Sequence, residues 1–177
     1  ARILYGGRIS ILIGLGCSLG ANVLGAALGC VAGYIGGKAD KVLLFVGEII
    51  TCFPQAMLVL IIQGLSGQGV GVMVAGFIFT GWFSTMRLTR SQILSLKQET
   101  FVESCRANGI RSSSIMFRHL LPNAMGPFIV NITMIVGAYV LAEPGLSFLN
   151  LGVPKGIPTW GNMVEAARSI GNMVNYP

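Results

Sequence analysis

The sequence predicts an all-α integral membrane protein, a polytopic bundle of transmembrane helices. Hydrophobic residues make up 53% of the 177 residues and charged residues only 10%, whereas soluble domains carry about 25% charged residues. The mean hydropathy is +0.74, and no charge occurs in the three stretches 9–37, 49–86 and 120–142. So few charges could not cover the surface of a soluble enzyme, and so apolar a chain would not be disordered.

The apolar stretches divide into four predicted spans. A bilayer core about 30 Å thick requires about 20 helical residues, so the stretch that ends at residue 86 is too long for one crossing. It divides at the glycine-rich turn 64–69, which is typical of a loop. The predicted spans are therefore 9–33, 42–64, 70–86 and 123–142.

The distribution of basic residues predicts the orientation. If the loop 87–122 is cytoplasmic, eight of the twelve Lys and Arg residues lie on the cytoplasmic side, as the positive-inside rule requires. Residues 143–177 then lie outside as an amphipathic segment, in which Pro144 interrupts any further span and Trp160 and Met163 rest on the membrane surface. The chain starts without Met or a signal peptide, so we interpret residues 1–177 as a single transmembrane domain within a longer protein.

Small residues recur every four positions in the first predicted span. Gly25, Gly29 and Gly33 share one helix face, and such faces allow another helix to approach closely. They could pack against helices of this chain, or they could also face a second membrane subunit.

Two acidic residues and a tryptophan in or near the predicted spans have specific expected positions. Glu48 lies inside the second span, where a carboxylate needs a partner or water; it could be a buried hydrogen-bonded group or face a translocation path. Glu143 is expected to mark the outer end of the fourth span. Trp82, followed by Arg87 and Arg90, is expected to anchor the third span at the headgroup level.

The loop 87–122 contains the most informative local pattern. Thr100 and Glu103 have the spacing of a capping box, and Gly109 is placed to end a helix in the left-handed conformation, which predicts a helix over 101–108. A second short helix is predicted from Ser112 to Pro122. Helices this short must dock on something. A DNA-binding helix-turn-helix would need longer helices and a third helix, so we expect no nucleic acid partner, and an ordinary loop near anionic lipid headgroups remains the simple alternative.

No catalytic, cofactor or metal site is expected from the motifs. The four cysteines are scattered, and no phosphate-binding GxxxxGK[ST] pattern occurs. The single histidine, His119, has no ligand cluster or base partner at a recognisable spacing. A membrane-embedded enzyme would need polar residues meeting at mid-membrane, and Asn22, Asn131 and Glu48 are too few for that alternative.

The same loop resembles the EAA loop of importer-type ABC permeases. That pattern is Glu-Ala-Ala, three residues, Gly, nine residues, Ile, one residue, Leu-Pro. The matching positions here are Glu103, Ser104, Cys105, Gly109, His119, Leu121 and Pro122. The two alanines become small residues, whereas the replacement of Ile by His119 is unexplained.

The resemblance extends over nearly the whole chain, to the second permease of oligopeptide and dipeptide importers. It rests on the ordered segments YGGRISILIG, AGYIGGKAD, FPQAMLVLII, HLLPNAMGPFIV and LAEPGLSFLNLGVPKGIPTWGNMVEAAR. The resemblance implies an inner-membrane subunit of six spans, the first before Ala1 and the last after Pro177. It further implies that the short loop helix inserts into a groove of a cytoplasmic ATPase, where Ser104 and Cys105 keep it thin.

The resemblance also implies the partners and the cargo class. The expected partners are a second permease, two ATPase subunits that bind the ATP, an extracytoplasmic solute-binding protein and the lipid bilayer. The expected cargo is an oligopeptide or dipeptide, moved by alternating access without covalent chemistry in this subunit. A permease for nickel or another metal chelate is the alternative, because such permeases resemble peptide permeases closely.

Overall fold

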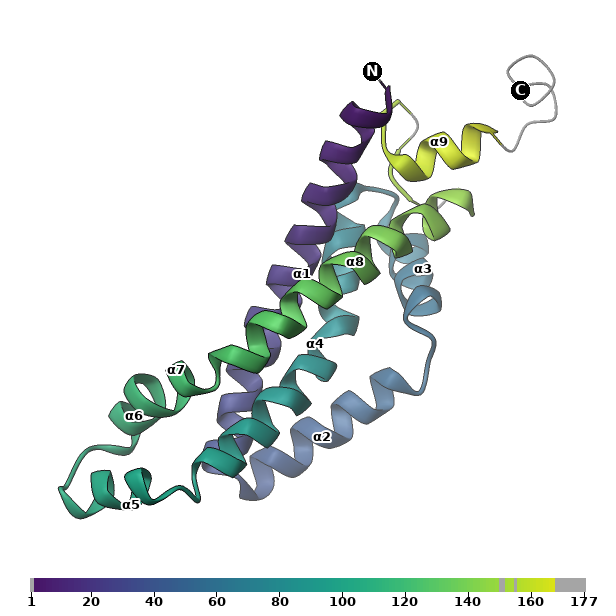
Figure 1. The fold of residues 1–177 in the computed structure, drawn as a ribbon. Helices are drawn as coiled ribbons and strands as arrows, with labels where there is room; N and C mark the ends of the chain where they lie inside the picture. The colour runs from purple at the N-terminus through teal and green to yellow at the C-terminus, as the bar shows by residue number, and fades with distance from the viewer. Residues whose placement is uncertain (1, 150–151, 155, 168–177) are drawn as a thin grey trace. The chain divides into compact units, whose positions relative to one another are not determined.

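The computed structural model describes residues 2–149, 152–154 and 156–167, and these residues are predominantly helical (Figure 1). The helices are α1 (Arg2–Ile35), α2 (Gly37–Thr51), α3 (Gln55–Ser66), α4 (Val70–Leu96), α5 (Thr100–Ala107), α6 (Ser112–Ile115), the π-helix η1 (Met116–Leu120), α7 (Leu121–Asn123), α8 (Met125–Phe148) and α9 (Trp160–Ala167). The predicted all-α membrane fold is confirmed.

Among the residues that the structure describes, three helices are long and apolar enough to cross a membrane. They contain Ile3–Ile35, Val70–Leu96 and Gly126–Phe148, and α2 with α3 provides a fourth candidate if this broken pair forms one span. The predicted spans 9–33 and 70–86 lie inside the first two helices. The exact ends of the spans stay predictions, because helix length alone does not locate a bilayer.

The predicted span 42–64 is interrupted between α2 and α3. Pro54 has an extended backbone, with φ −56° and ψ 128°, and proline cannot donate the N–H that would continue α2. The Thr51 hydroxyl donates to the carbonyl oxygens of Gly47 and Glu48, both at 3.0 Å, in the last turn of α2. Hydropathy responds to apolar composition and not to backbone donors, so it did not predict this break.

The chain contains two compact units. The first unit comprises residues 1–20, 53–80 and 134–177, and the second comprises residues 21–52 and 81–133. Helices α1, α4 and α8 each contribute residues to both units.

The first unit is built from close contacts between long helices. Phe77 of α4 and Tyr139 of α8 meet edge to face, with ring centroids 5.2 Å apart. Gly14 of α1 lies directly against Val140, so any side chain at this position would collide with α8. Gln55 of α3 donates to the Thr80 hydroxyl at 3.1 Å.

Helix α8 is longer than the predicted fourth span. It continues through Pro144 to Phe148, so the expectation that Pro144 interrupts any span was wrong. Membrane-type helices tolerate an internal proline where neighbouring elements satisfy the freed backbone groups. Glu143, expected to mark the outer end of this span, lies five residues before the end of α8, and its side chain is completely buried inside the first unit.

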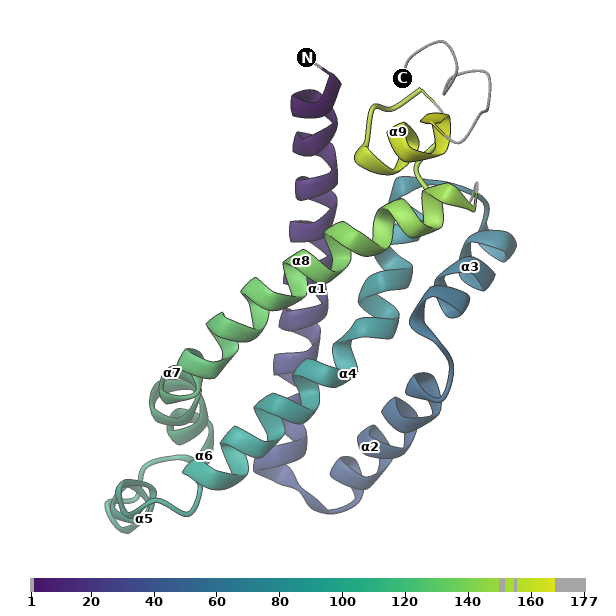
Figure 2. The same cartoon turned by 45° about the vertical axis from the view of Figure 1, so that its right-hand side comes forward.

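The second unit contains the glycine row of α1. A Cβ at Gly29 would lie 2.7 Å from the Met86 carbonyl oxygen, and a Cβ at Gly33 would lie 3.0 Å from the Arg90 carbonyl oxygen. A Cβ at Gly25 would lie closer still to the Trp82 carbonyl oxygen, so the three glycines follow successive turns of α4. The C-terminal half of α1 lies beside α4 in Figure 2. Within this unit the row is a contact between two helices of the same chain.

Trp82 is not placed to anchor a helix among headgroups. It is only 5% exposed and packs in a cluster with Ala32, Phe83 and Met86. The anchoring prediction was wrong because α4 does not end near Arg87; it continues to Leu96, and the tryptophan faces the core.

A polar cluster joins α1, α4 and α8 within the second unit. The Asn22 side-chain oxygen accepts from the Thr85 hydroxyl at 3.0 Å and from the Asn131 amide at 3.1 Å. The Asn131 amide also donates to the Thr85 hydroxyl at 3.1 Å. Two of the three polar residues singled out from the sequence therefore meet, whereas the third, Glu48, is exposed.

Candidate functional site

The loop between α4 and α8 contains the first predicted short helix. The helix is α5, and Gly109 after it has φ +72°. The Gly109 N–H donates to the Arg106 carbonyl at 3.0 Å and the Ile110 N–H to the Cys105 carbonyl at 3.1 Å, which is the paired hydrogen bonding of a Schellman motif. The predicted helix ending and the left-handed glycine are both present.

The start of α5 differs from the prediction. The N-cap residue is Glu99, and no side chain caps this end, so Thr100 and Glu103 do not form a capping box. Thr100 already belongs to the helix, and its carbonyl oxygen accepts from the Ser104 hydroxyl at 3.1 Å. The Glu103 carboxylate is thus left on the exposed side.

The second predicted helix begins at Ser112 and consists of α6, η1 and α7 in succession. The Leu121 N–H donates to the Met116 carbonyl, five residues earlier, which defines the wide turn of a π-helix. Pro122 follows and offers no N–H to the Arg118 carbonyl. The Asn123 side-chain Nδ2 donates to the His119 carbonyl at 2.9 Å, so a side chain supplies a donor to the backbone next to the proline.

The inner side of the loop is apolar and packs against α1 and α4. A cluster of buried residues takes one member from each of α1, α4, α5, α6 and η1: Cys30, Ile93, Val102, Ile115 and Leu120. Cys105 and Leu121 are partly buried against this cluster. Cys105 therefore packs on its own chain, so a bulky substitution there would disturb the loop's own packing.

The outer side of the loop carries charge and one large aromatic ring. Its exposed residues include Glu103, Ser104, Arg106, Gly109, Arg111, Phe117, Arg118 and Pro122. The Phe117 side chain is 62% exposed, and His119 beside it is half-buried. A short helix, a glycine turn and an exposed aromatic ring can fit into a groove of another protein.

Two basic residues fasten the base of the loop to α1 and α2. Arg90 donates from Nη2 to Oδ2 of Asp40 at 2.7 Å and from Nε to Oδ1 at 2.5 Å. Lys97 donates to the Tyr34 carbonyl at 2.9 Å and so satisfies an oxygen at the end of α1. Arg90 was expected to help anchor the third span and Lys97 contributed only to the predicted orientation, so neither contact was predicted; the acidic residue Asp40 among the basic residues was the signal for a pair.

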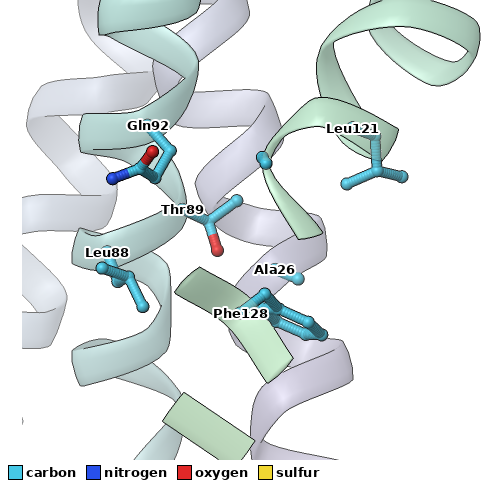
Figure 3. Close-up of a pocket in the computed structure, with 7 residues that line it drawn as sticks. Ala26, Leu88, Thr89, Gln92, Leu121 and Phe128 are labelled. Carbon is cyan, nitrogen blue, oxygen red and sulfur yellow. The ribbon is translucent and has the colours of Figure 1, made fainter. Parts of the chain in front are cut away.

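A small pocket lies beside the point where the loop joins α8 (Figure 3). It has a volume of about 30 Å³ and is lined by Ala26, Leu88, Thr89, Gln92, Leu121, Ala124 and Phe128. The Thr89 hydroxyl is buried and has no hydrogen-bond partner among the described residues. The pocket is large enough for about one water molecule.

Across the residues that the structure describes, no group of three His, Cys, Asp or Glu side chains is arranged to hold a metal ion. The arrangement at the loop is therefore one of shape and charge. It can bind a protein surface and transmit movement to the helices beneath it.

Comparison with known proteins identifies the family of the chain. Residues 25–173 match the family described as binding-protein-dependent transport system inner membrane component. The chain is 31% identical over 176 residues to the oligopeptide transport system permease protein OppC of Bacillus subtilis (strain 168), which covers 99% of this chain and 57% of that protein.

Two further relatives carry related descriptions. The dipeptide transport system permease protein DppC of Bacillus subtilis (strain 168) is 35% identical over 164 residues, covering 93% of this chain and 51% of that protein. The glutathione transport system permease protein GsiD of Pectobacterium atrosepticum is 34% identical over 169 residues, covering 96% and 56%. This chain spans about half the length of these curated relatives.

These matches cover the loop and the long apolar helices alike. The predicted resemblance to the second permease of peptide importers is confirmed, and so is the predicted inner-membrane location. The chain belongs to the family of inner membrane components of binding-protein-dependent transport systems.

Proposed function

We propose that the protein containing this chain is a permease subunit of an ATP-driven importer of oligopeptides or dipeptides. The observation that carries this proposal is the loop 100–122. Its helix, glycine turn and second helix reproduce the spacing of the EAA pattern, with an apolar side fixed on the chain and a charged side exposed. The subunit provides a path and performs no covalent chemistry.

The packing of the loop supports a role in coupling to an ATPase. Val102 and Leu120 lie in one buried cluster with Cys30 of α1 and Ile93 of α4. Protein interiors are close-packed and transmit displacement instead of absorbing it. A force applied to the exposed side of α5 would therefore reach both long helices and drive alternating access.

The names of the relatives support the cargo class and the partners. The three relatives are described as permeases for oligopeptides, dipeptides and glutathione, all of which contain amide-linked amino acids. The partners we propose are a second permease subunit, two cytoplasmic ATPases and an extracytoplasmic solute-binding protein. The family description itself specifies dependence on a binding protein.

The coupling role is tested by replacing Gly109, whose φ is +72°. Valine at this position disfavours the left-handed conformation by about 1–2 kcal/mol, whereas asparagine tolerates it. We expect Gly109→Val to insert normally in the membrane but to lower peptide uptake and cargo-stimulated ATP hydrolysis sharply. Gly109→Asn, the matched control, should retain most of both activities.

The assay uses the assembled transporter in proteoliposomes with labelled di- and tripeptides and, separately, with nickel. The isolated ATPases should keep their basal activity, because the change lies in transmission. Normal uptake by Gly109→Val with the ATPases still bound would refute the coupling role. Uptake of nickel but of no peptide would refute the cargo class.

A further inference from the structure

Glu143 is a completely buried carboxylate within the apolar helix α8. Its Oε1 accepts hydrogen bonds from the Ser147 hydroxyl at 2.8 Å and from the Thr159 hydroxyl at 2.9 Å. Its Oε2 accepts from the Ser10 hydroxyl of α1 at 3.2 Å. One side chain thus gathers hydroxyl groups from α1, from α8 and from the residue before α9, all within the first unit.

The hydrogen bonds of these hydroxyls determine where their protons lie. The Ser10 oxygen accepts from the Trp160 N–H at 3.1 Å, and the Thr159 oxygen accepts from the Asn162 N–H at 3.1 Å. Each hydroxyl has one proton, which is therefore directed to Glu143. Glu143 is therefore the acceptor in all three hydrogen bonds, and among the described residues it is paired with no Lys, Arg or His.

The beginning of α9 adds two N–H groups to the hydrogen-bond network around Glu143. Thr159 precedes the helix and its hydroxyl accepts the N–H of the third helical residue, which makes it the N-cap. The first N–H groups of a helix carry a partial positive charge. Two of them, from Trp160 and Asn162, are linked to Glu143 through a single hydroxyl each.

The close approach of the segment depends on glycines. A Cβ at Gly161 would lie 2.5 Å from Glu143 Oε1 and 2.6 Å from the Ser147 oxygen. On α1, a Cβ at Gly7 would lie 2.8 Å from Cζ2 of Trp160, and a Cβ at Gly6 would lie 3.2 Å from the Met163 sulfur. The segment therefore fits against α1 and α8 at van der Waals distance.

The contacts alter the predicted picture of this segment. Trp160 and Met163 were expected to rest on the membrane surface, but both pack on α1, and the Trp160 ring N–H donates to the Ile3 carbonyl at 3.1 Å. Residues 168–177 of the predicted segment lie outside the described residues. The segments YGGRIS, EPGLSF and TWGNM, which lie far apart in the sequence, are thus in contact with one another.

We propose that Glu143 is the positioning residue of a clasp, formed by Ser10, Glu143, Ser147 and Thr159, that keeps residues 158–163 fixed on α1 and α8 throughout transport. Opening the segment would remove the Thr159 donor from Glu143 and the Trp160 N–H from the Ser10 oxygen, and losing hydrogen-bond donors is costly for a buried carboxylate. In this proposal the clasp therefore stays closed throughout transport and is not a gate. The role of the clasp in transport rests on the proposed function, whereas the contact of residues 158–163 with α1 and α8 does not.

The closure is tested by disulfide cross-linking in a background without native cysteines. The pair Gly6→Cys and Met163→Cys, whose positions are in contact, should form a disulfide on mild oxidation. The control pair Gly16→Cys and Met163→Cys should not, because nothing lies within 4 Å of a Cβ at Gly16. The yield should be the same in the resting and the vanadate-trapped transporter.

The role of the hydroxyl network is tested by two variants at one position. Thr159→Val preserves shape but removes the cap and the bond to Glu143, so it should lower the ratio of closed to open segment about fivefold and with it the cross-linking yield. Thr159→Ser retains the hydroxyl and should restore the yield. Glu143→Gln, which retains one acceptor oxygen, should give an intermediate yield. Equal yields for valine and serine would overturn the proposal.

The permanence of the clasp is tested by uptake after cross-linking. Oxidised transporter should import labelled peptide at the rate of the reduced sample, and Thr159→Val should import more slowly than Thr159→Ser. Loss of uptake on oxidation, restored by reductant, would mean that the segment is a gate and would overturn the proposal. A transporter that imports no peptide even when reduced contradicts the proposed function, while the yields still report on the clasp.

Discussion

Thr85 and Thr89 lie one helical turn apart on α4, yet their hydroxyl groups have different surroundings. Thr85 donates to Asn22 and accepts from Asn131. Thr89, only 4% exposed, has no hydrogen-bond partner for its hydroxyl among the described residues. Burying an unpaired hydroxyl is unfavourable, whereas a bonded one contributes to stability.

The two threonines predict opposite effects of the same substitution. Thr89→Val removes an unpaired polar group at constant shape and should leave stability unchanged or raise it by up to about 1 kcal/mol. Thr85→Val breaks the polar cluster and should destabilise by about 0.5–2 kcal/mol. Thermal unfolding of the purified transporter in detergent measures both, and an equal loss for the two variants would contradict this account.

The two glutamates inside the apolar regions have different surroundings. Glu48 was expected to need a partner or water, either as a buried group or facing a translocation path, and it is exposed; Glu143 was expected at a span end and is buried. Hydropathy locates a residue along the chain but not around the helix. The surroundings of each carboxylate therefore depended on the packing of α1, α8 and the segment before α9.

Among the elements, α1 shows how a regular sequence pattern acquires its meaning from a neighbour. Gly29 lies against the backbone of α4, whereas Gly16 on the same helix has open space where a Cβ would be. The four-residue spacing predicted a contact face, but only the fold identified α4 as the helix in contact with Gly25, Gly29 and Gly33. Whether the row also contributes to assembly stays a prediction.

The glycine row predicts a position-dependent response to leucine. Gly29→Leu would collide with the Met86 carbonyl and Thr89, separate α1 from α4, and destabilise the subunit by about 1–3 kcal/mol. Gly16→Leu, the matched control, should have little effect on the stability of the subunit. Resistance to limited proteolysis in detergent reports the difference; a Gly29→Leu subunit as resistant as the wild type would show that α1 does not rest on α4.

For the whole molecule, the topology predicted from charge is tested by two single cysteines in a cysteine-free background. Val164 of α9 is 52% exposed, and Gln98 before α5 is exposed. A membrane-impermeant thiol reagent added outside intact cells should label Val164→Cys directly. Gln98→Cys should react only after the membrane is permeabilised, and the reverse pattern would refute the orientation.

The sequence by itself determined the membrane class, the family and the arrangement of the loop. Composition measures how much apolar surface must avoid water, and a short helix followed by a glycine is specified by residues close together in the chain. Both signals are local, so the helix ending at Gly109 and the second helix up to Pro122 were predicted close to their observed positions.

Only the tertiary structure decided which distant residues meet. Ser10 lies 133 residues before Glu143, and no local pattern specifies that their side chains share a hydrogen bond. The side on which Cys105 packs, the burial of Trp82 and the partner of the glycine row were decided in the same way. Each of these outcomes depends on which face of a helix is turned toward its neighbours. That rotation is determined by the packing of several helices together, and the sequence of one helix alone does not determine it.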